Sequence, residues 1–141
     1  MMFTKILVAH DGSEHGWKAL SVGLSVAAKF RGAVHCVSVK EKLPVYAATV
    51  GEVMEASGEM KAFFDELTAR ANAEAEKAGV SLTVKILSGH EVQTIIEYAK
   101  SGKFDLMIIG FMGLSSLYDR IWGSTSQNLT RLSPCTVMIV K

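Results

Sequence analysis

Short runs of Val, Ile and Leu alternate along this chain with segments whose apolar residues recur every three or four positions. Runs that are apolar at nearly every position are typical of strands buried on both faces, which requires a parallel sheet covered by helices. Segments with helical spacing supply those helices. The alternation therefore predicts an α/β fold, with a five-stranded parallel sheet and helices on both of its faces.

The expected elements follow one another in the order βαβαβαβαβ. The first helix is expected to begin at about Ser13, a suitable N-cap, and the second to end at Gly79. Residues 40–58 are expected to begin as a loop and to become helical near their end, and the third helix to stop near Gly102. The strands are expected at residues 3–10, 33–39, 82–87, 104–109 and 136–140, and the last helix at 123–132.

The chain has 141 residues and contains no internal repeat, low-complexity tract or Pro/Gly-rich linker. A chain of this length fits one domain and buries about 70% of its unfolded surface. We therefore expect residues 1–141 to form a single domain.

Composition excludes several functional classes. The formal net charge is +1 with both signs scattered, whereas nucleic-acid binding needs a concentrated basic face. No apolar run approaches the roughly 18 residues of a membrane span, and the first apolar run is too short for a secretory signal. Cys36 and Cys135 both lie in apolar runs, as buried reduced thiols do. We expect a cytoplasmic protein that binds neither nucleic acid nor membranes.

The positions of polar residues and glycines discriminate between two strand orders. Right-handed crossovers leave 3-2-1-4-5, which opens a ligand crevice between strands one and four, and 2-1-3-4-5, which opens it between strands one and three. The first strand ends in Asp11 and Gly12 and the fourth in Gly110, whereas the turn after the third strand, residues 88–90, is short and plain. The chemistry-bearing residues thus favour the order 3-2-1-4-5.

Two glycine-containing elements flank one loop in the last third of the chain. Gly110 and Gly113 follow the fourth strand, and Gly123 precedes a Ser-Thr-Ser run, residues 124–126, that opens the last helix. Glycine lets backbone approach a ligand closely, and a helix N-terminus offers free N–H groups and a positive dipole end to an anion. The pattern predicts a cradle for the phosphates of a nucleotide.

Asp11 is expected to face this cradle across the switch point, where its carboxylate would accept hydrogen bonds from ribose hydroxyls or a base amine. Each residue also has a plain structural alternative. Asp11 could cap the first helix, Gly110 and Gly113 could serve a tight turn, and the serines could cap the last helix. Their combination at one crevice favours ligand binding.

At these residues the chain resembles a known family. The spacing Gly110-x2-Gly113-x9-Gly123-Ser124 is similar to the nucleotide-binding signature of universal stress proteins. The opening residues 6–13 (ILVAHDGS) and the closing residues 134–140 (PCTVMIV) resemble the ends of the same proteins, so the likeness covers essentially the whole chain. It implies a Rossmann-like α/β domain, usually a homodimer, whose ATP-binding members use this signature. Such proteins are generally regulatory or protective in stress responses, with weak or absent ATP hydrolysis.

The resemblance also implies roles for single residues. Ala9 would line the adenine pocket, Asp11 would contact ribose or base, and the backbone of Val39 would meet adenine. The remaining nucleotide-binding residues would be Gly110, Met112, Gly113, Gly123, Ser124, Thr125 and Ser126. The loop departs from the family pattern at Phe111 and Met112, where small polar and basic or His residues are usual. This apolar pair removes a possible phosphate donor and leaves open the choice between ATP, with or without Mg²⁺, and shorter nucleotides.

Several kinds of chemistry are absent. The sequence has neither the Gly-x4-Gly-Lys-Ser/Thr loop nor the Gly-x-Gly-x-x-Gly fingerprint, and its four histidines are too dispersed for a metal site. No residue is identified as nucleophile or general base, and His10 is interpreted as a spacer in its turn. We expect an ATP-binding regulatory or protective module. The alternatives are a weak ATP hydrolase or nucleotidyl transferase on the same scaffold, and a nucleotide-free interaction protein.

The last strand predicts an assembly. In the order 3-2-1-4-5 it is an edge, yet residues 135–140 carry no charge. Because an uncovered apolar edge invites aggregation, we expect a two-fold homodimer through this strand, besides an unknown protein partner. Met54, Met60, Phe63 and Phe64 are interpreted as core or subunit-contact surface, with a cofactor-binding surface as the second alternative.

Overall fold

The computed structural model describes residues 2–41, 50–112 and 124–141, with side chains from residue 57 onward in the helix that begins at Val50. Gly113 and Gly123, two of the expected phosphate-binding residues, lie outside these ranges, as does the side chain of Met54. The described elements are β1 Lys5–Ala9, α1 Glu14–Phe30, β2 Ala33–Lys40, α2 Val50–Ala78, β3 Leu82–Ser88, α3 Glu91–Gly102, β4 Leu106–Gly110, α4 Ser124–Leu132 and β5 Thr136–Val140.

All five described strands are parallel and lie in the order β3-β2-β1-β4-β5. This confirms the strand order that we predict from the sequence. Val8 of β1 lies opposite Cys36 of β2 on one side and Ile108 of β4 on the other. β1 is therefore the central strand, and its carboxyl end lies beside that of β4.

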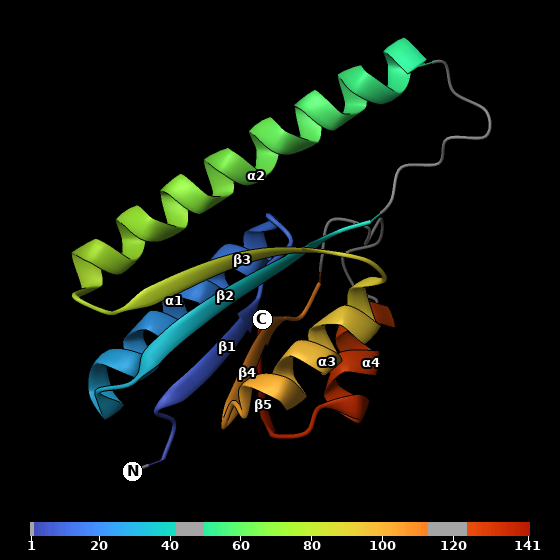
Figure 1. Ribbon diagram of the computed structural model, residues 1–141. Coiled ribbons are helices and arrows are strands. Elements are labelled where there is room, and N and C mark those ends of the chain that lie inside the picture. The colour runs from blue at the N-terminus through green and yellow to red at the C-terminus, as the bar shows by residue number, and fades with distance from the viewer. Residues whose placement is uncertain (1, 42–49, 113–123) are drawn as a thin grey trace.

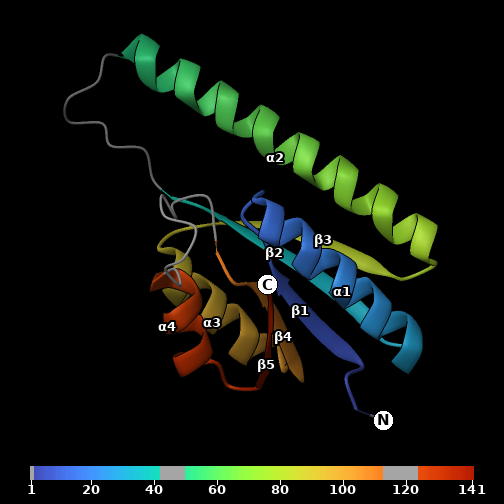
Figure 2. The same ribbon diagram turned by 180° about the vertical axis from the view of Figure 1, so that it is seen from behind.

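Helices cover both faces of the sheet, as expected, with α1 and α2 on one face and α3 and α4 on the other (Figures 1 and 2). Side chains alternate between the two faces along each strand. Val8 and Ile108 are fully buried in the core beneath α1 and α2, whereas Leu7 and Met107 are fully buried beneath α3 and α4. Both faces are apolar, which explains the near-continuous Val/Ile/Leu runs.

Several boundaries differ from the expected ones, and β4, for example, is Leu106–Gly110 instead of residues 104–109. β1 begins at Lys5 rather than at residue 3, because Phe3 has a φ of 61°, which no strand residue adopts. α2 is helical from Val50, well before the expected point near Gly58, since Glu, Met and Ala favour helix there despite two glycines. Among the described ranges, no helix combines the length and apolar composition needed to cross a bilayer, and this includes α2.

Candidate functional site

A cavity of about 490 Å³ lies at the carboxyl ends of the central strands. It opens where β1 and β4 lie side by side, because α1 follows β1 onto one face of the sheet and α4 follows β4 onto the other. Ligands of open α/β sheets bind at such switch points, and the volume is within the usual range for ligand pockets. The topology therefore places one ligand-sized cavity where the sequence predicts it.

Most of the expected site residues that the structure describes line this cavity. Ser124, the exposed first residue of α4, is described but does not line it. The expected residues that do line it are Ala9, Asp11, Val39, Gly110, Met112, Thr125 and Ser126.

The turn after β1 is held by hydrogen bonds to the side chains of Asp11, Ser13 and His10. Oδ1 of Asp11 accepts a hydrogen bond from the N–H of Ser13 at 2.9 Å, and Oγ of Ser13 accepts one from the N–H of Gly16 at 3.1 Å. Ser13 is therefore the N-cap of α1, as predicted, and the alternative that Asp11 caps the helix is wrong. Asp11 closes the turn with one carboxylate oxygen and lies on the cavity wall.

His10 holds the other side of this turn. The residue is 3% exposed, and Nδ1 of its ring accepts a hydrogen bond from the N–H of Gly12 at 3.0 Å. The ring meets Trp17 edge to face at a centroid distance of 4.2 Å, and the guanidinium of Arg70 lies 3.9 Å from the Trp17 centroid. Burial lowers the pKa of His10 to about 4, an effect that Asp11 opposes and Arg70 reinforces. His10 is thus a neutral, structural part of the turn, more than the spacer we expect from sequence.

Gly110 is required by packing between α1 and β4. A Cβ at this position would lie 2.7 Å from Cβ of His15 and 2.8 Å from its backbone carbonyl carbon. The carbonyl oxygen of Gly110 accepts a hydrogen bond from Oγ of Ser126 at 2.8 Å. The hydroxyl of Ser126 therefore ties α4 to β4. Both residues thus have a structural role besides lining the cavity, but not the ones weighed from the sequence: Gly110 is not among the glycines with positive φ, and Ser126 bonds to β4 instead of capping its helix.

One wall of the cavity is not among the site residues expected from the sequence. On α2, four residues line it: Glu59, Met60, Phe63 and Phe64. Their spacing places them on one side of the helix. Of the two main roles expected for Phe63, core is wrong, because the residue is 41% exposed, whereas subunit contact stays a prediction. The helical period was a usable signal for this shared face, but it does not say what the face covers.

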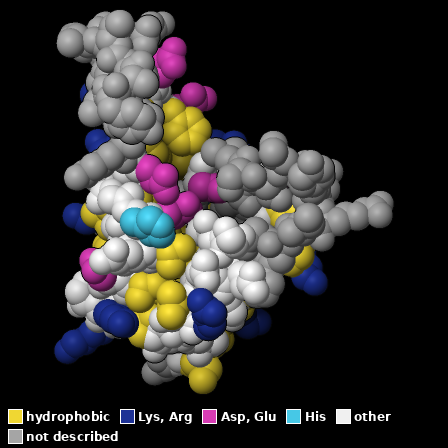
Figure 3. Space-filling model, turned by 90° about the vertical axis from the view of Figure 1, so that its right-hand side faces the viewer, with side chains coloured by type: hydrophobic (Ala, Val, Ile, Leu, Met, Phe, Trp, Pro, Cys, Tyr) yellow, Lys and Arg dark blue, Asp and Glu magenta, His cyan; other side chains and the backbone are white. Residues whose placement is uncertain are grey.

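The cavity is acidic over the part of the chain that the structure describes. Four of its described lining residues are carboxylates, Asp11, Glu41, Glu59 and Glu91, against the single cation Lys40. Burial raises the pKa of Glu91, and the carboxylates of Asp11 and Glu41 raise it further, whereas His90 lowers it. On this end of the molecule, acidic side chains gather beside hydrophobic ones, with Lys and Arg farther out (Figure 3). Such walls suit ligand groups that donate hydrogen bonds.

Comparison with known proteins agrees with this geometry. The Universal stress protein family model matches residues 2–141. A universal stress protein of Thermus aquaticus is 30% identical, with 99% of this chain and 100% of that protein covered.

Solved structures share the fold. The universal stress protein UspA of Lactobacillus plantarum has a TM-score of 0.86 at 23% identity, covering 100% of this chain and 99% of that one. A universal stress protein in complex with cAMP has a TM-score of 0.72 at 25% identity, covering 100% and 98%. An Arabidopsis thaliana family protein with AMP bound has a TM-score of 0.66 at 18% identity, covering 98% and 91%. With a family model matched over nearly its whole length, the chain belongs to the universal stress protein family.

Proposed function

We propose that the cavity binds an adenine nucleotide, and that this chain is a nucleotide-dependent regulatory or protective module of the cytoplasmic stress response. The observation that carries this proposal is the ligand-sized cavity at the β1/β4 switch point, lined by Asp11 and the first turn of α4. The bound cAMP and AMP of two structural relatives support it.

The two ends of the cavity suit the two ends of a nucleotide. Ala9 and Val39 offer apolar surface to adenine, and the carboxylate of Asp11 accepts hydrogen bonds from ribose hydroxyls. Thr125 lies in the first turn of α4, where backbone N–H groups lack helical partners and the dipole favours an anion. The nucleoside therefore lies toward β1 and β2, and the phosphates toward α4.

ATP is the nucleotide that we propose, on the resemblance of Gly110, Gly113, Gly123 and Ser124 to the family signature. The acidic described walls repel a bare triphosphate, so we expect ATP to bind as its Mg²⁺ complex. A nucleotide that fits one loop state better than another stabilises that state, which is how occupancy would be communicated to a partner.

Mass analysis of the small molecules released from freshly purified, denatured protein tests this proposal directly. An adenine nucleotide in the released fraction, together with calorimetric binding of Mg²⁺-ATP, is the expected result. Gly123→Val, which places a branched side chain at the expected phosphate position, should abolish binding and provides the blank for a phosphate-release assay. If no nucleotide were released and the protein bound none of ATP, ADP and AMP, the alternative hypothesis of a nucleotide-free interaction protein would be favoured.

We also propose a two-fold homodimer through β5. This strand forms one edge of the sheet and pairs with β4 only. Val137, Met138, Ile139 and Val140 are only partly buried in the single chain, and none carries a charge. A second copy of the same edge would cover them and complete the pairing. Light scattering that gives the monomer mass at micromolar concentration would contradict this assembly.

A further inference from the structure

The cavity wall formed by α2 is the part of the site that the resemblance to the family did not indicate. We call Glu59, Met60, Phe63 and Phe64 the α2 wall. The wall lies directly before the buried stretch of α2 that packs on the sheet, which starts at Leu67 and includes Ala71 and Ala75. In Figure 1 the helix continues from there toward its N-terminus and extends beyond the sheet. The α2 wall is thus held over the carboxyl edge by the packing behind it.

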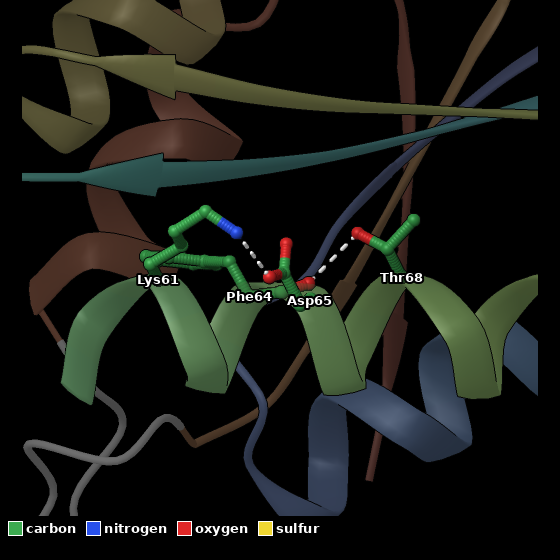
Figure 4. A network of polar contacts seen from close by, with 4 residues as sticks. All are labelled: Lys61, Phe64, Asp65 and Thr68. Atoms are coloured by element: carbon green, nitrogen blue, oxygen red, sulfur yellow. Dashed lines mark hydrogen bonds and ion pairs between the residues drawn. The ribbon is translucent and has the colours of Figure 1, made fainter. Parts of the chain in front are cut away.

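Two contacts between residues four positions apart lie along α2 at this point. Oγ1 of Thr68 donates a hydrogen bond to the carbonyl oxygen of Phe64 at 2.8 Å, and Lys61 pairs with Asp65 at 2.7 Å (Figure 4). Lys61 and Asp65 are exposed and do not line the cavity. The helix therefore separates a charged, solvated side from the aromatic residues of the wall.

Phe63 is seated against the turn that carries Asp11. Gly12 has a φ of 86°, and a Cβ at this position would lie 2.4 Å from Cζ of Phe63. The ring of Phe63 therefore uses the space that the glycine leaves. Its centroid is 5.1 Å from that of Phe64, with the two ring planes at 78°. Much of Phe63 nevertheless stays exposed, which leaves ring surface that a second flat group can cover.

The surroundings of this aromatic pair specify what would cover it. Nucleobases stack on aromatic side chains, and the carboxylates of Glu41 and Glu91, which line the same cavity, can accept hydrogen bonds from N–H groups at a base edge. We infer that the base of the bound nucleotide stacks on the ring face of Phe63, with Phe64 meeting it edge to face, which makes α2 part of the ligand site. This inference rests on the proposed function and adds a residue pair that discriminates between ligands with and without a base.

Calorimetry with AMP on Phe63→Leu tests the inference, because the half-exposed ring can be replaced without emptying the core. Loss of stacking should raise the dissociation constant for AMP by about five- to a hundredfold. Phe63→Trp should keep or improve the affinity. Lys61→Ala, on the same helix but off the cavity, and Phe30→Leu, in an aromatic pair with Phe3, are the matched controls and should bind AMP as the unchanged protein does.

Ribose 5-phosphate, measured by competition against AMP, separates stacking from a merely structural effect. Stacking predicts that Phe63→Leu leaves the ribose 5-phosphate affinity unchanged, whereas a displaced α2 would weaken both ligands. Equal AMP affinity in Phe63→Leu and the unchanged protein, or equal losses for both ligands, would overturn the inference and leave the proposed function standing. If the unchanged protein bound neither AMP nor ATP, both the stacking inference and the proposed function would be contradicted.

Discussion

Replacing His10 by asparagine should reduce the acid sensitivity of the fold. The imidazole is buried in the turn after β1, and its pKa falls from an ordinary value of 6.5 to about 4 in the folded protein. In the unfolded chain it takes up a proton more readily, so the native state loses stability as the pH falls from about 6.5 toward 4 and keeps all of it above that range. The difference of about 2.5 pKa units corresponds to about 3 kcal/mol.

Asparagine retains the essential geometry without titrating. Its Oδ1 can accept the hydrogen bond that Nδ1 of His10 receives from Gly12, although the ring contact with Trp17 is lost. The variant should therefore be less stable near neutral pH but should lose about 3 kcal/mol less between about pH 7.5 and about pH 4.

Urea unfolding at those two pH values measures this difference directly. Carboxylates other than Asp11, which interacts with His10, contribute equally to both proteins and cancel. His35→Asn serves as the comparison, because burial lowers the pKa of His35 as well but its ring is more exposed, so its effect should be smaller. If the free energy of unfolding of His10→Asn falls as steeply with acid as that of the unchanged protein, the buried neutral imidazole is not the cause.

Three further outcomes test the site and its supports. Asp11→Asn keeps an acceptor for the N–H of Ser13 but removes the charge, so nucleotide affinity should fall by about 1–3 kcal/mol in calorimetry with little change in melting temperature; a change in melting alone would make Asp11 purely structural. Gly110→Ala forces a Cβ onto the backbone of His15 and should cost about 1–3 kcal/mol in urea unfolding, and an unchanged unfolding midpoint would contradict the close packing. Burial raises the pKa of Cys36 to about 12, so its thiol should resist alkylation in the native protein at about pH 8 and react in urea, as mass spectrometry would show; rapid native labelling would contradict its burial.

The strand order and the part of the site that follows β1 and β4 could both be predicted from the sequence, because both depend on chain topology. Chain topology brings the residues after β1 and β4 to one edge of the sheet, so Asp11 and Gly110 meet regardless of how the helices pack in detail. No equivalent rule exists for α2. The periodicity of Met60, Phe63 and Phe64 shows that they share a face, but the position of that face depends on where Leu67 is anchored, which only tertiary packing determines.

Gly110 illustrates a second limit of sequence reasoning. Close approach by a ligand and close approach by a helix both demand a residue without a side chain, so the glycine itself cannot distinguish them. The structure shows the backbone of His15 at the place where a Cβ would be, which accounts for the glycine without any ligand. A glycine pattern is therefore stronger support for a site when the neighbouring positions, such as Asp11 and Thr125, also line a cavity.

The turn after β1 joins folding and ligand binding in the same few residues. A Cβ at Gly16 would lie 2.5 Å from Nδ1 of His10, and one at Gly12 would meet the ring of Phe63, so each glycine admits an aromatic or imidazole ring against the turn. His10 is the ring that connects the turn to Trp17 and thus to Arg70 of α2, while Asp11 faces the cavity. Because the turn supports both the docking of α2 and the cavity wall, substitutions in it should change stability and affinity together. Only a variant such as Asp11→Asn, which preserves the hydrogen bond of the turn, separates the two quantities.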